Sequence, residues 1–425
     1  MTIYRATVLD TPVDPFQGGT LRSESDVALA VTDGRISARG PLAEVRAGAP
    51  DDEIVDLRHG VLLPGFVDTH VHYPQVRAIG ALGMPLLDWL QHSALPEEAR
   101  LHDTSYAQQI AAEFLHGLTS AGTTSALVFG SHFASAVDVL FTHAEAIGVR
   151  VTSGLVVSDR LLRDELLTTP ERAYDESVTL AARWAGHDRL RYAVTPRFSY
   201  SCSAELLDAC GAAYKDITGA WCTSHVNENV TEVAEVARLF GGSSYVGTYQ
   251  DHGLLGAHTV LAHNVHPTEA ELDMLAASGA AVAHCPTSNS SLGSGMFPLA
   301  AHLQHGVRVA MGTDVGGGTG FSMLKEGLQA YFMQSLLGDQ GVPLTSAHLL
   351  HLATTAGADA LGLRDDVGEL SVGKQFDAVL VAPEADSPLG VGIRHAAGPD
   401  DALAKIFAMG TPADLTQVWI GGRLL

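Results

Sequence analysis

The sequence predicts an α/β fold: a (β/α)₈ TIM barrel with a small β-sandwich domain formed from both chain ends. Two patterns predict it. In the middle of the chain, apolar runs of about four to seven residues alternate with amphipathic stretches of roughly 10–16 residues, as strands alternate with helices. Eight such units fill roughly 270 residues, which is the number and size expected of this barrel. Both chain ends instead show short apolar segments separated by Gly, Pro and Asp turns.

The terminal segments are expected to form strands only, because neither shows helical periodicity. The expected strands are Tyr4–Leu9, Val27–Val31, Ile54–Leu57, Asp377–Val381 and Val418–Ile420, the last followed by the turn Gly421-Gly422. We therefore predict two domains. Residues 1–63 and 368–425 together form the composite β domain, and residues 64–367 form the barrel.

The barrel strands are predicted from continuous apolar runs, as expected for parallel strands that are buried on both faces. These runs are Gly65–His70, Ser125–Phe129, Val151–Val157, Tyr192–Thr195, Ala220–Ser224, Val260–His263, Ala281–His284 and Val307–Gly312. The helices between and after them are expected at Tyr106–Ser120, Ser135–Ala146, Ala173–Trp184, Ala204–Tyr214, Val230–Leu239, Glu269–Ala277, Pro298–Gln304 and Ser322–Leu336.

The composition excludes several classes of partner. The 425 residues include 25 Lys and Arg against 48 Asp and Glu, a net charge of −23 that repels nucleic acid and anionic membrane surfaces. No apolar run reaches the ~18 residues of a membrane helix, and the first residues lack the regions of a signal peptide. The four cysteines form no CxxC pair. A reduced, cytoplasmic protein with neither a nucleic acid nor a membrane partner is therefore expected.

Polar residues at the predicted strand ends indicate a metal site, because the chemistry of such barrels lies at the C-terminal ends of their strands. His70 and His72 alternate on the first strand, so both imidazoles point the same way. His225 and Asp314 follow the ends of two other strands. Three nitrogens and one carboxylate suit zinc, with one position left for water. The alternative is that these residues are ordinary polar caps on buried strands.

A single metal ion is expected, because no lysine lies on a predicted strand. Two-metal hydrolases of this architecture commonly bridge their ions with a carboxylated lysine, whereas Lys215 ends a predicted helix and Lys325 lies within one. His263, at another strand end, is then expected to act as a hydrogen-bonding electrophile near the metal-bound water. Iron could replace zinc in a site of three histidines and one aspartate.

Glu228 is a candidate for general acid–base catalysis, because it follows His225 by three residues and lies beyond the predicted strand. A free carboxylate beside metal-bound hydroxide should have a raised pKa, which suits proton transfer. The alternative is that Glu228 opens the next helix, where acidic residues favour the helix dipole. Trp89, in the segment after the metal strand, is expected either to line a pocket or simply to pack.

The segment PGFVDTHVH, from Pro64 to His72, resembles the first-strand signature of the amidohydrolase superfamily. Further segments resemble the guanine deaminases within it: HVHYPQ at 70–75, LLDWL at 86–90, TPRFS at 195–199, AHCPTSN at 283–289 and GTDVGGG at 312–318. Together they cover the barrel from about residue 62 to residue 340. The one departure lies at residues 225–229, where the family usually has His-Ile-Ser-Glu-Asn and this chain has HVNEN.

This resemblance implies zinc-dependent hydrolysis of guanine to xanthine and ammonia in purine catabolism. The implied zinc ligands are His70, His72, His225 and Asp314. Zinc would lower the pKa of its water toward ~7. Asp314 would accept the proton as hydroxide attacks C2 of the base, Glu228 would protonate the ring nitrogen beside C2, and His263 would steady the attacking oxygen. A homodimer is the habit of the family.

The resemblance also implies the residues that bind the base. Arg197 and Gln75 would contact its polar edges, and Phe198 and Trp89 would lie against the ring. Arg197 follows a predicted strand by two residues, and the segment after it, residues 198–203, is uncharged. Its guanidinium is therefore expected to have free donors for two adjacent acceptors of the base. The alternative is a structural arginine that bridges barrel loops.

Two other functions remain open at this point. The nearer one is a deaminase or dechlorinase of another flat heterocycle, such as a pterin, 8-oxoguanine or a triazine. The other is a catalytically silent barrel that serves as a binding protein. Such proteins typically lose metal ligands, and every expected ligand is present in this sequence.

Overall fold

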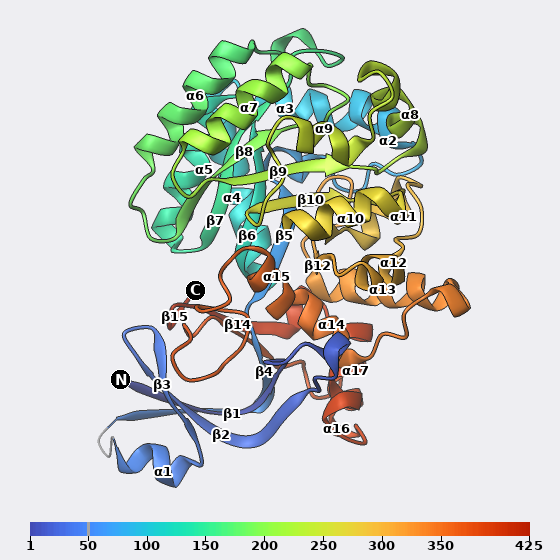
Figure 1. Cartoon of the computed structure of the whole chain (residues 1–425). Helices are drawn as coiled ribbons and strands as arrows, with labels where there is room; N and C mark the ends of the chain where they lie inside the picture. Colours follow the sequence, from blue (N-terminus) through green and yellow to red (C-terminus); the bar gives the residue numbers. More distant parts are fainter. Residues whose placement is uncertain (49–51) are drawn as a thin grey trace.

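The computed structural model describes residues 1–48 and 52–425. Figure 1 shows a large barrel of strands and helices above a smaller sheet, with both chain termini on the side of that sheet. One sheet has eight strands and the other has seven. The predicted α/β fold is confirmed.

Eight parallel strands form the larger sheet, in the order β12-β11-β10-β9-β8-β7-β6-β5. Their bounds are β5 (Phe66–His72), β6 (Thr123–Ser131), β7 (Arg150–Val157), β8 (Leu190–Pro196), β9 (Trp221–Val226), β10 (Thr259–His263), β11 (Ala281–His284) and β12 (Arg308–Met311). The two edge strands meet, because Thr69 Oγ1 donates to Met311 O and Asp314 N donates to His70 O, both at 2.8 Å. The sheet thus curls into a near-closed barrel, and all eight predicted strands are confirmed.

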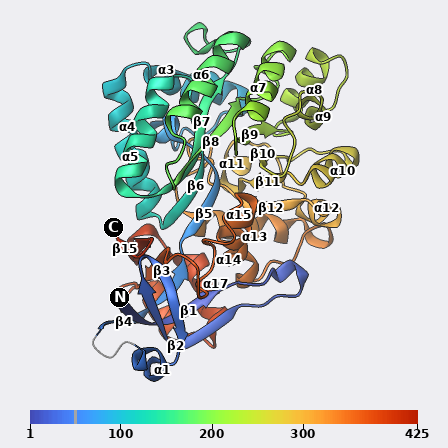
Figure 2. The same ribbon diagram turned by 60° about the vertical axis from the view of Figure 1, so that its left-hand side comes forward.

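The helices predicted between the strands are also present. They are α4 (Thr104–Ser120), α5 (Ala134–Ile147), α6 (Pro170–Arg183), α7 (Ala204–Asp216), α8 (Val230–Leu239), α10 (Glu269–Ser278), α12 (Leu299–Gln304) and α13 (Met323–Leu336). Figure 2 shows these helices around the outside of the barrel strands. Shorter helices occupy the connections: α2 (Leu86–Trp89), α3 (Leu95–Arg100), α9 (Tyr245–Asp251), α11 (Pro286–Ser291), α14 (Ser346–Ala353) and α15 (Thr355–Ala360). None of the helices in the described ranges is both long and apolar enough to cross a membrane.

The smaller sheet combines both chain ends, as predicted. Its order is β15-β14-β13-β4-β1-β2-β3. The strands are β1 (Thr2–Asp10), β2 (Arg22–Thr32), β3 (Arg35–Gly40), β4 (Glu53–Pro64), β13 (Ala378–Val381), β14 (Leu415–Ile420) and β15 (Arg423–Leu424). β4 pairs in parallel with β1 and antiparallel with β13, so the two ends of the chain meet there within one mixed sheet. The boundaries at residues 63/64 and 367/368 stay a prediction.

The prediction that both chain ends contain strands only is wrong. The described parts of these ends contain three α-helices: α1 (Leu42–Ala47), α16 (Pro388–Arg394) and α17 (Pro399–Met409). Helix α17 buries the side chains of Leu403, Ile406 and Phe407. The Phe407 ring packs closely against Gly327 of α13, where an added Cβ would lie 2.6 Å from the ring. This apolar face covers only one helical turn, so the surrounding Gly, Pro and Asp residues hide its period in the sequence.

The strand that carries His70 and His72 is continuous with the smaller sheet. β4 ends at Pro64 and β5 begins at Phe66, with only Gly65 between them. A Cβ at Gly65 would lie 2.4 Å from the Thr124 side chain, so only glycine fits at this position. The smaller sheet therefore fixes one end of the strand that leads into the site.

Candidate active site

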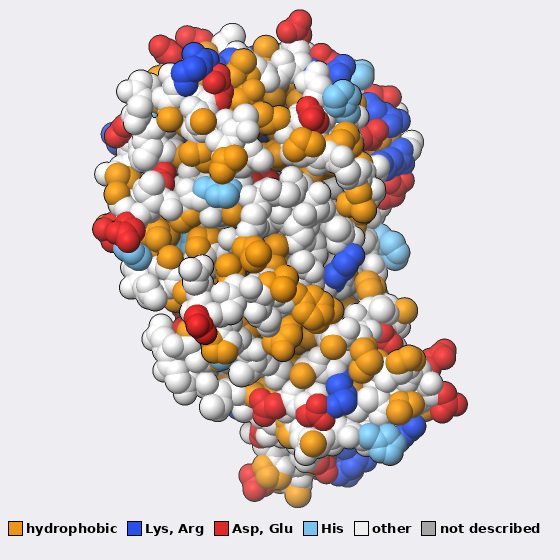
Figure 3. Space-filling model, turned by 90° about the vertical axis from the view of Figure 1, so that its right-hand side faces the viewer, with side chains coloured by type: hydrophobic (Ala, Val, Ile, Leu, Met, Phe, Trp, Pro, Cys, Tyr) orange, Lys and Arg blue, Asp and Glu red, His pale blue; other side chains and the backbone are white. Residues whose placement is uncertain are grey.

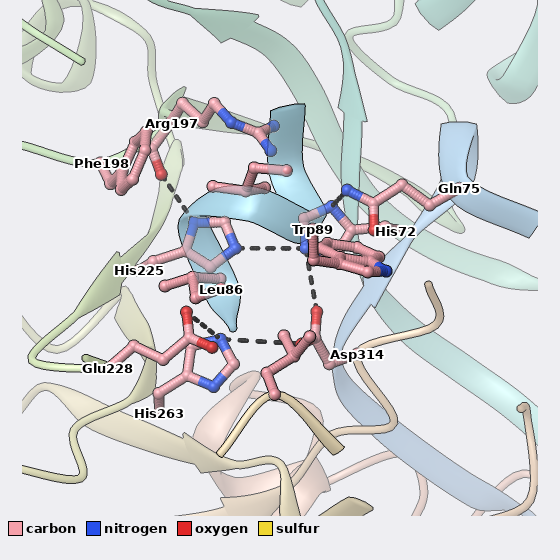
Figure 4. A pocket seen from close by; sticks show the side chains of 12 residues that line it. His72, Gln75, Leu86, Trp89, Arg197, Phe198, His225, Glu228, His263 and Asp314 are labelled. Atoms are coloured by element: carbon pink, nitrogen blue, oxygen red, sulfur yellow. Dashed lines mark hydrogen bonds and ion pairs between the residues drawn. The ribbon is translucent and has the colours of Figure 1, made fainter. Parts of the chain in front are cut away.

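Four side chains that could bind a metal meet at the C-terminal ends of barrel strands. His70 and His72 lie on β5, His225 lies on β9, and Asp314 follows β12. Their ligand atoms lie within 4.8 Å of one another, and all four residues are buried. Figure 4 shows His72, His225 and Asp314 facing one another. The structure thus brings together the predicted donors into a buried site of three histidines and one aspartate, the donor set of zinc hydrolases.

Most of these donors stand at the spacing of neighbouring ligands around one zinc ion. His72 Nε2 lies 3.1 Å from both His70 Nε2 and His225 Nε2, and 3.0 Å from Asp314 Oδ1. The distance from His70 Nε2 to Asp314 Oδ1 is 3.3 Å. Ligands bound at ~2.0–2.1 Å in a tetrahedral zinc site stand about 3.3 Å apart. Four of the six donor pairs therefore stand near this spacing, and all six lie within 4.8 Å.

Contacts behind the donors fix their orientation. His225 Nδ1 donates a hydrogen bond of 2.7 Å to the backbone oxygen of Arg197, which leaves the Nε2 lone pair directed at the centre. Asp314 has a φ of 48°, a left-handed conformation that is rare for residues other than glycine. Its backbone N–H bonds to His70 O, so this strained conformation is held against the strand that carries two other donors.

Burial and hydrogen bonding set the charge of the donors. Burial lowers the pKa of His72 to about 4, and burial and the neighbouring His70 lower the pKa of His225 well below its usual value. Burial alone would raise the pKa of Asp314, but its contacts with His70 and His72 outweigh that effect and hold the pKa well below the usual range. The site thus offers neutral imidazoles and an ionised carboxylate, which are the forms that bind a metal.

Glu228 lies beside these donors and outside the following helix. Helix α8 begins at Val230 with Asn229 as its cap, so Glu228 stands in the connection between β9 and α8. Ser294 Oγ donates to Glu228 Oε1 at 3.2 Å. Burial, followed by the charge of Asp314, raises the pKa of Glu228 to about 8. A carboxyl group with this pKa can hold and release a proton near neutral pH.

His263 faces the same space from the end of β10. Its Nε2 lies 3.5 Å from Glu228 Oε2 and 3.8 Å from Asp314 Oδ2. On its other side, Nδ1 lies 3.0 Å from Asn289 Oδ1 and donates to it. Within the described residues, His263 Nε2 is buried and has no hydrogen-bond partner, which leaves it free for a bound molecule.

A pocket opens over the donors. Apolar side chains form much of its wall: Leu86, Trp89, Leu90, Phe198 and Leu292. The polar lining consists of His72, Gln75, Arg197, His225, Glu228, His263 and Asp314. Figure 4 shows Gln75 and Trp89 on one side and Arg197 and Phe198 on the other. Trp89 lines the pocket and is also packed within the hydrophobic core, so its role against the base stays a prediction.

The uncharged flank of Arg197 predicts a guanidinium with free donors, but the side chain also has an acidic partner from a distant part of the chain. Its Nη1 donates to both oxygens of Glu98, at 2.9 and 2.8 Å, and both side chains are almost completely buried. Glu98 lies on α3, 99 positions earlier in the chain, and sequence reasoning missed it. No signal in the sequence marks Glu98, because it stands beside Glu97 in an ordinary acidic helix turn.

Other residues that could have held a second ion lie elsewhere. His284, at the end of β11, stacks on Phe297 with ring centroids 4.2 Å apart and is not part of the donor cluster. Lys215 lies on α7 and Lys325 on α13, and no strand among residues 1–48 and 52–425 contains a lysine. With His284 outside the donor cluster and both lysines on helices, the arrangement of side chains favours a site for one ion.

Comparisons with known proteins agree with this geometry. Residues 61–425 match the amidohydrolase family. Over its whole length the chain is 59% identical to a probable guanine deaminase of Deinococcus radiodurans and covers 98% of that protein. The solved structure of Escherichia coli guanine deaminase superposes with a TM-score of 0.96 at 35% identity, covering 100% of this chain and 99% of that one. A guanine deaminase of C. acetobutylicum with guanine bound in its active site gives a TM-score of 0.91 at 25% identity, covering 100% and 99% of the two chains.

Proposed function

The chain belongs to the amidohydrolase family and, within it, to the guanine deaminases, and we propose that it uses one zinc ion to convert guanine into xanthine and ammonia. The observation that carries the proposal is the buried set of three histidines and one aspartate at the floor of a pocket. That pocket also presents an arginine, a glutamine and flat aromatic walls, which suit a planar base with polar edges.

The metal would be held by His70, His72, His225 and Asp314. When bound, zinc supplies a Lewis acid that makes water a nucleophile near neutral pH. The contact from His225 Nδ1 to the Arg197 backbone orients one of these donors, and the Asp314 carboxylate is ionised before the ion arrives. Iron would fit the same donors, and zinc is the ion that we propose.

The proton transfers are assigned to Asp314 and Glu228. As water attacks C2 of guanine, a C–O bond forms and Asp314 takes up the released proton. Glu228 is protonated near neutral pH and gives a proton to the ring nitrogen beside C2. Asp314 then passes its proton to the amino group, so the C2–N bond breaks and ammonia leaves. Glu228 takes the proton of the C2 hydroxyl as this group becomes the carbonyl of xanthine, which returns both carboxyl groups to their starting forms. His263 Nε2, which faces Glu228 and Asp314, would hold the attacking oxygen.

The remaining pocket residues would bind the base. Arg197 commits one guanidinium nitrogen to Glu98 and keeps other N–H donors for acceptors on the base. Gln75, which bonds to the same Glu98 oxygen, offers its amide near the guanidinium, and Phe198 and Trp89 offer ring faces. An uncharged base also suits a chain with a net charge of −23, which disfavours a nucleotide phosphate.

The test is ammonia release by the purified, metal-loaded protein with guanine, adenine, pterin, a triazine and cytosine. Guanine is expected to be the best substrate and xanthine its product. Faster turnover of pterin or the triazine would instead assign the site to another flat heterocycle. An absence of ammonia from every substrate would reject the enzymatic function.

Location and assembly complete the proposal. A cytoplasmic location is supported by four free, buried cysteines. A homodimer is supported by exposed apolar side chains on α13, namely Tyr331, Phe332 and Leu336. Figure 3 shows hydrophobic side chains gathered across the middle of one face, while most charged groups lie toward its ends and right-hand margin. Light scattering of the purified protein would measure the mass of the assembly.

A further inference from the structure

Glu98 lies at the junction of three connections around the pocket. It accepts hydrogen bonds from Gln75, which follows β5, and from Arg197, which follows β8. His132, which follows β6, places its Nε2 3.3 Å from Glu98 Oε2. Glu98 itself does not line the pocket. Its contacts with the pocket therefore run through the two residues to which base binding is assigned above.

The carboxylate of Glu98 fixes which end of the Gln75 amide faces it. A carboxylate oxygen only accepts, so the amide nitrogen of Gln75 turns toward it and donates at 2.7 Å. The same nitrogen also lies 3.1 Å from His72 Nδ1. The other end of the amide, Gln75 Oε1, is then left buried without a hydrogen-bond partner among the described residues. A Cβ at Gly316 would lie 2.1 Å from this oxygen, so the backbone closes in on one side of it. Such an oxygen is an acceptor in need of a donor.

Glu98 also fixes Arg197. Both of its oxygens lie within 2.9 Å of the single nitrogen Nη1, which directs the rest of the guanidinium fork away from Glu98. Burial opposes ionisation of Glu98, but the charge of Arg197, followed by the contact with His132, outweighs it and lowers the pKa of Glu98 to about 2. The carboxylate is thus charged at neutral pH. Its negative charge balances the positive charge of Arg197, which would be costly to bury without a partner.

We propose that Glu98 is the positioning residue for substrate selection in this pocket: it holds the Arg197 fork and turns the Gln75 carbonyl outward. Because both side chains bond to Glu98 Oε1, the guanidinium donors and the amide acceptor lie close to one another in the pocket wall. This pattern fits a base that has an acceptor and an N–H donor next to each other on one edge. This inference rests on the proposed function. It adds the residue that sets the arrangement of hydrogen-bond donors and acceptors in the pocket.

The test is the variant Glu98→Gln, loaded with zinc. A neutral amide presents a donor as well as an acceptor, so it no longer dictates the orientation of Gln75 and no longer balances Arg197. The KM for guanine is expected to rise at least ~10-fold with kcat within about 3-fold, because binding is lost while the proton-transfer groups are untouched. Glu271→Gln is the matched control. Glu271 is also buried and accepts from the Val246 and Thr268 backbones, so this variant tests the loss of a buried carboxylate away from the pocket.

A double-mutant cycle separates positioning from general destabilisation. If Glu98 acts through Arg197, the combined variant Glu98→Gln/Arg197→Lys should lose clearly less kcat/KM than the product of the two single losses. Independent, multiplying losses would overturn the proposal, as would an unchanged KM in Glu98→Gln. If Glu98→Gln does not fold, Glu98→Asp is the second variant. It keeps the negative charge but has a shorter side chain, so its carboxylate is displaced from Gln75 and Arg197 and the KM is expected to rise in the same way.

A crystal structure of the zinc-loaded variant gives a readout that does not depend on activity. The Gln75 amide and the Arg197 guanidinium are expected to leave their positions in Glu98→Gln, and unchanged positions would overturn the role of Glu98. If the parent protein releases no ammonia from guanine, the proposed function fails. The structure of the variant then still decides whether Glu98 positions the two side chains.

Discussion

The backbone oxygen of Arg197 accepts a hydrogen bond of 2.7 Å from Nδ1 of His225. One residue thus orients a metal donor through its main chain and faces the pocket with its side chain. Phe198, the next residue, forms a parallel bridge with His225, which strengthens the same connection. Changes in the backbone at Arg197 should therefore disturb metal binding and base binding together, whereas changes of its side chain should disturb base binding and leave metal binding intact.

The first prediction concerns the number of metal ions. The purified protein should contain about one zinc or iron per chain by elemental analysis, because four donors converge on one point and no strand lysine is present to bridge a second ion. His225→Ala should lose most of the metal. His284→Ala, which removes a buried histidine at the end of another barrel strand, should retain it. Two ions per chain would contradict the single-ion site.

The second prediction concerns Glu228. Glu228→Gln keeps the size of the side chain and its contact with Ser294 but cannot carry a proton. The metal content and the melting temperature should stay close to those of the parent, while kcat falls at least ~10²-fold, the lower end for loss of general acid–base catalysis. Glu271→Gln, far from the donors, should retain kcat. Turnover of Glu228→Gln within about fivefold of the parent would remove Glu228 from the mechanism.

The third prediction concerns Arg197→Lys. Lysine keeps the charge beside Glu98 but cannot reproduce the planar fork, so kcat/KM for guanine should fall roughly 5- to 150-fold, from the loss of ~1–3 kcal/mol. Because the guanidinium is buried and paired, the melting temperature should also fall, while the metal content should not. Arg191→Lys, at the opposite end of the same strand, is the matched control. An unchanged kcat/KM in Arg197→Lys would make the arginine purely structural.

The fourth prediction concerns pH and Glu326 on α13. This buried glutamate accepts from the Thr287 N–H at 2.9 Å, and burial raises its pKa from 4.5 to about 8. A folded-state pKa above the unfolded value makes a contribution to stability that is complete below pH 4.5 and lost as the pH rises through 8. Glu326→Gln lacks this titration. Thermal unfolding should be measured at several pH values. As the pH rises through this range, the free energy of unfolding of the variant should increase relative to that of the parent by up to ~1.4 kcal/mol per pH unit. A constant difference from pH 5 to 8.5 would contradict the raised pKa.

The barrel and the metal donors could be predicted because both leave a local signal. Buried parallel strands appear in the sequence as unbroken apolar runs. The two histidines of β5 are two positions apart, which is the spacing of side chains on the same face of a strand. Helix α17 could not be predicted in the same way, since its buried face is a single turn that matters only once α13 packs against it. Local patterns therefore identified the scaffold and missed elements whose form depends on a neighbour.

The wall of the pocket shows the same limit. Arg197 lies in a stretch without acidic neighbours, and the uncharged flank suggested a free guanidinium. Its partner Glu98 comes from a helix 99 positions away, and only the folded barrel brings the two together. The conformation of Asp314 is equally hidden, because its positive φ is imposed by the bond to His70 across the barrel seam.

The continuity of β4 into β5 has a consequence for the order of folding. β4 pairs with β1 on one side, but residues 61–64 gain their partner on the other side only after residues 378–381 have been synthesised. The strand that bears His70 and His72 is therefore anchored by a contact of very long sequence separation. Contacts of this kind form slowly, because a long loop must close before they contribute. On a ribosome, the metal site would be among the last parts of the molecule to mature, and nascent barrel lacking the final strands would expose its unpaired edges to chaperones.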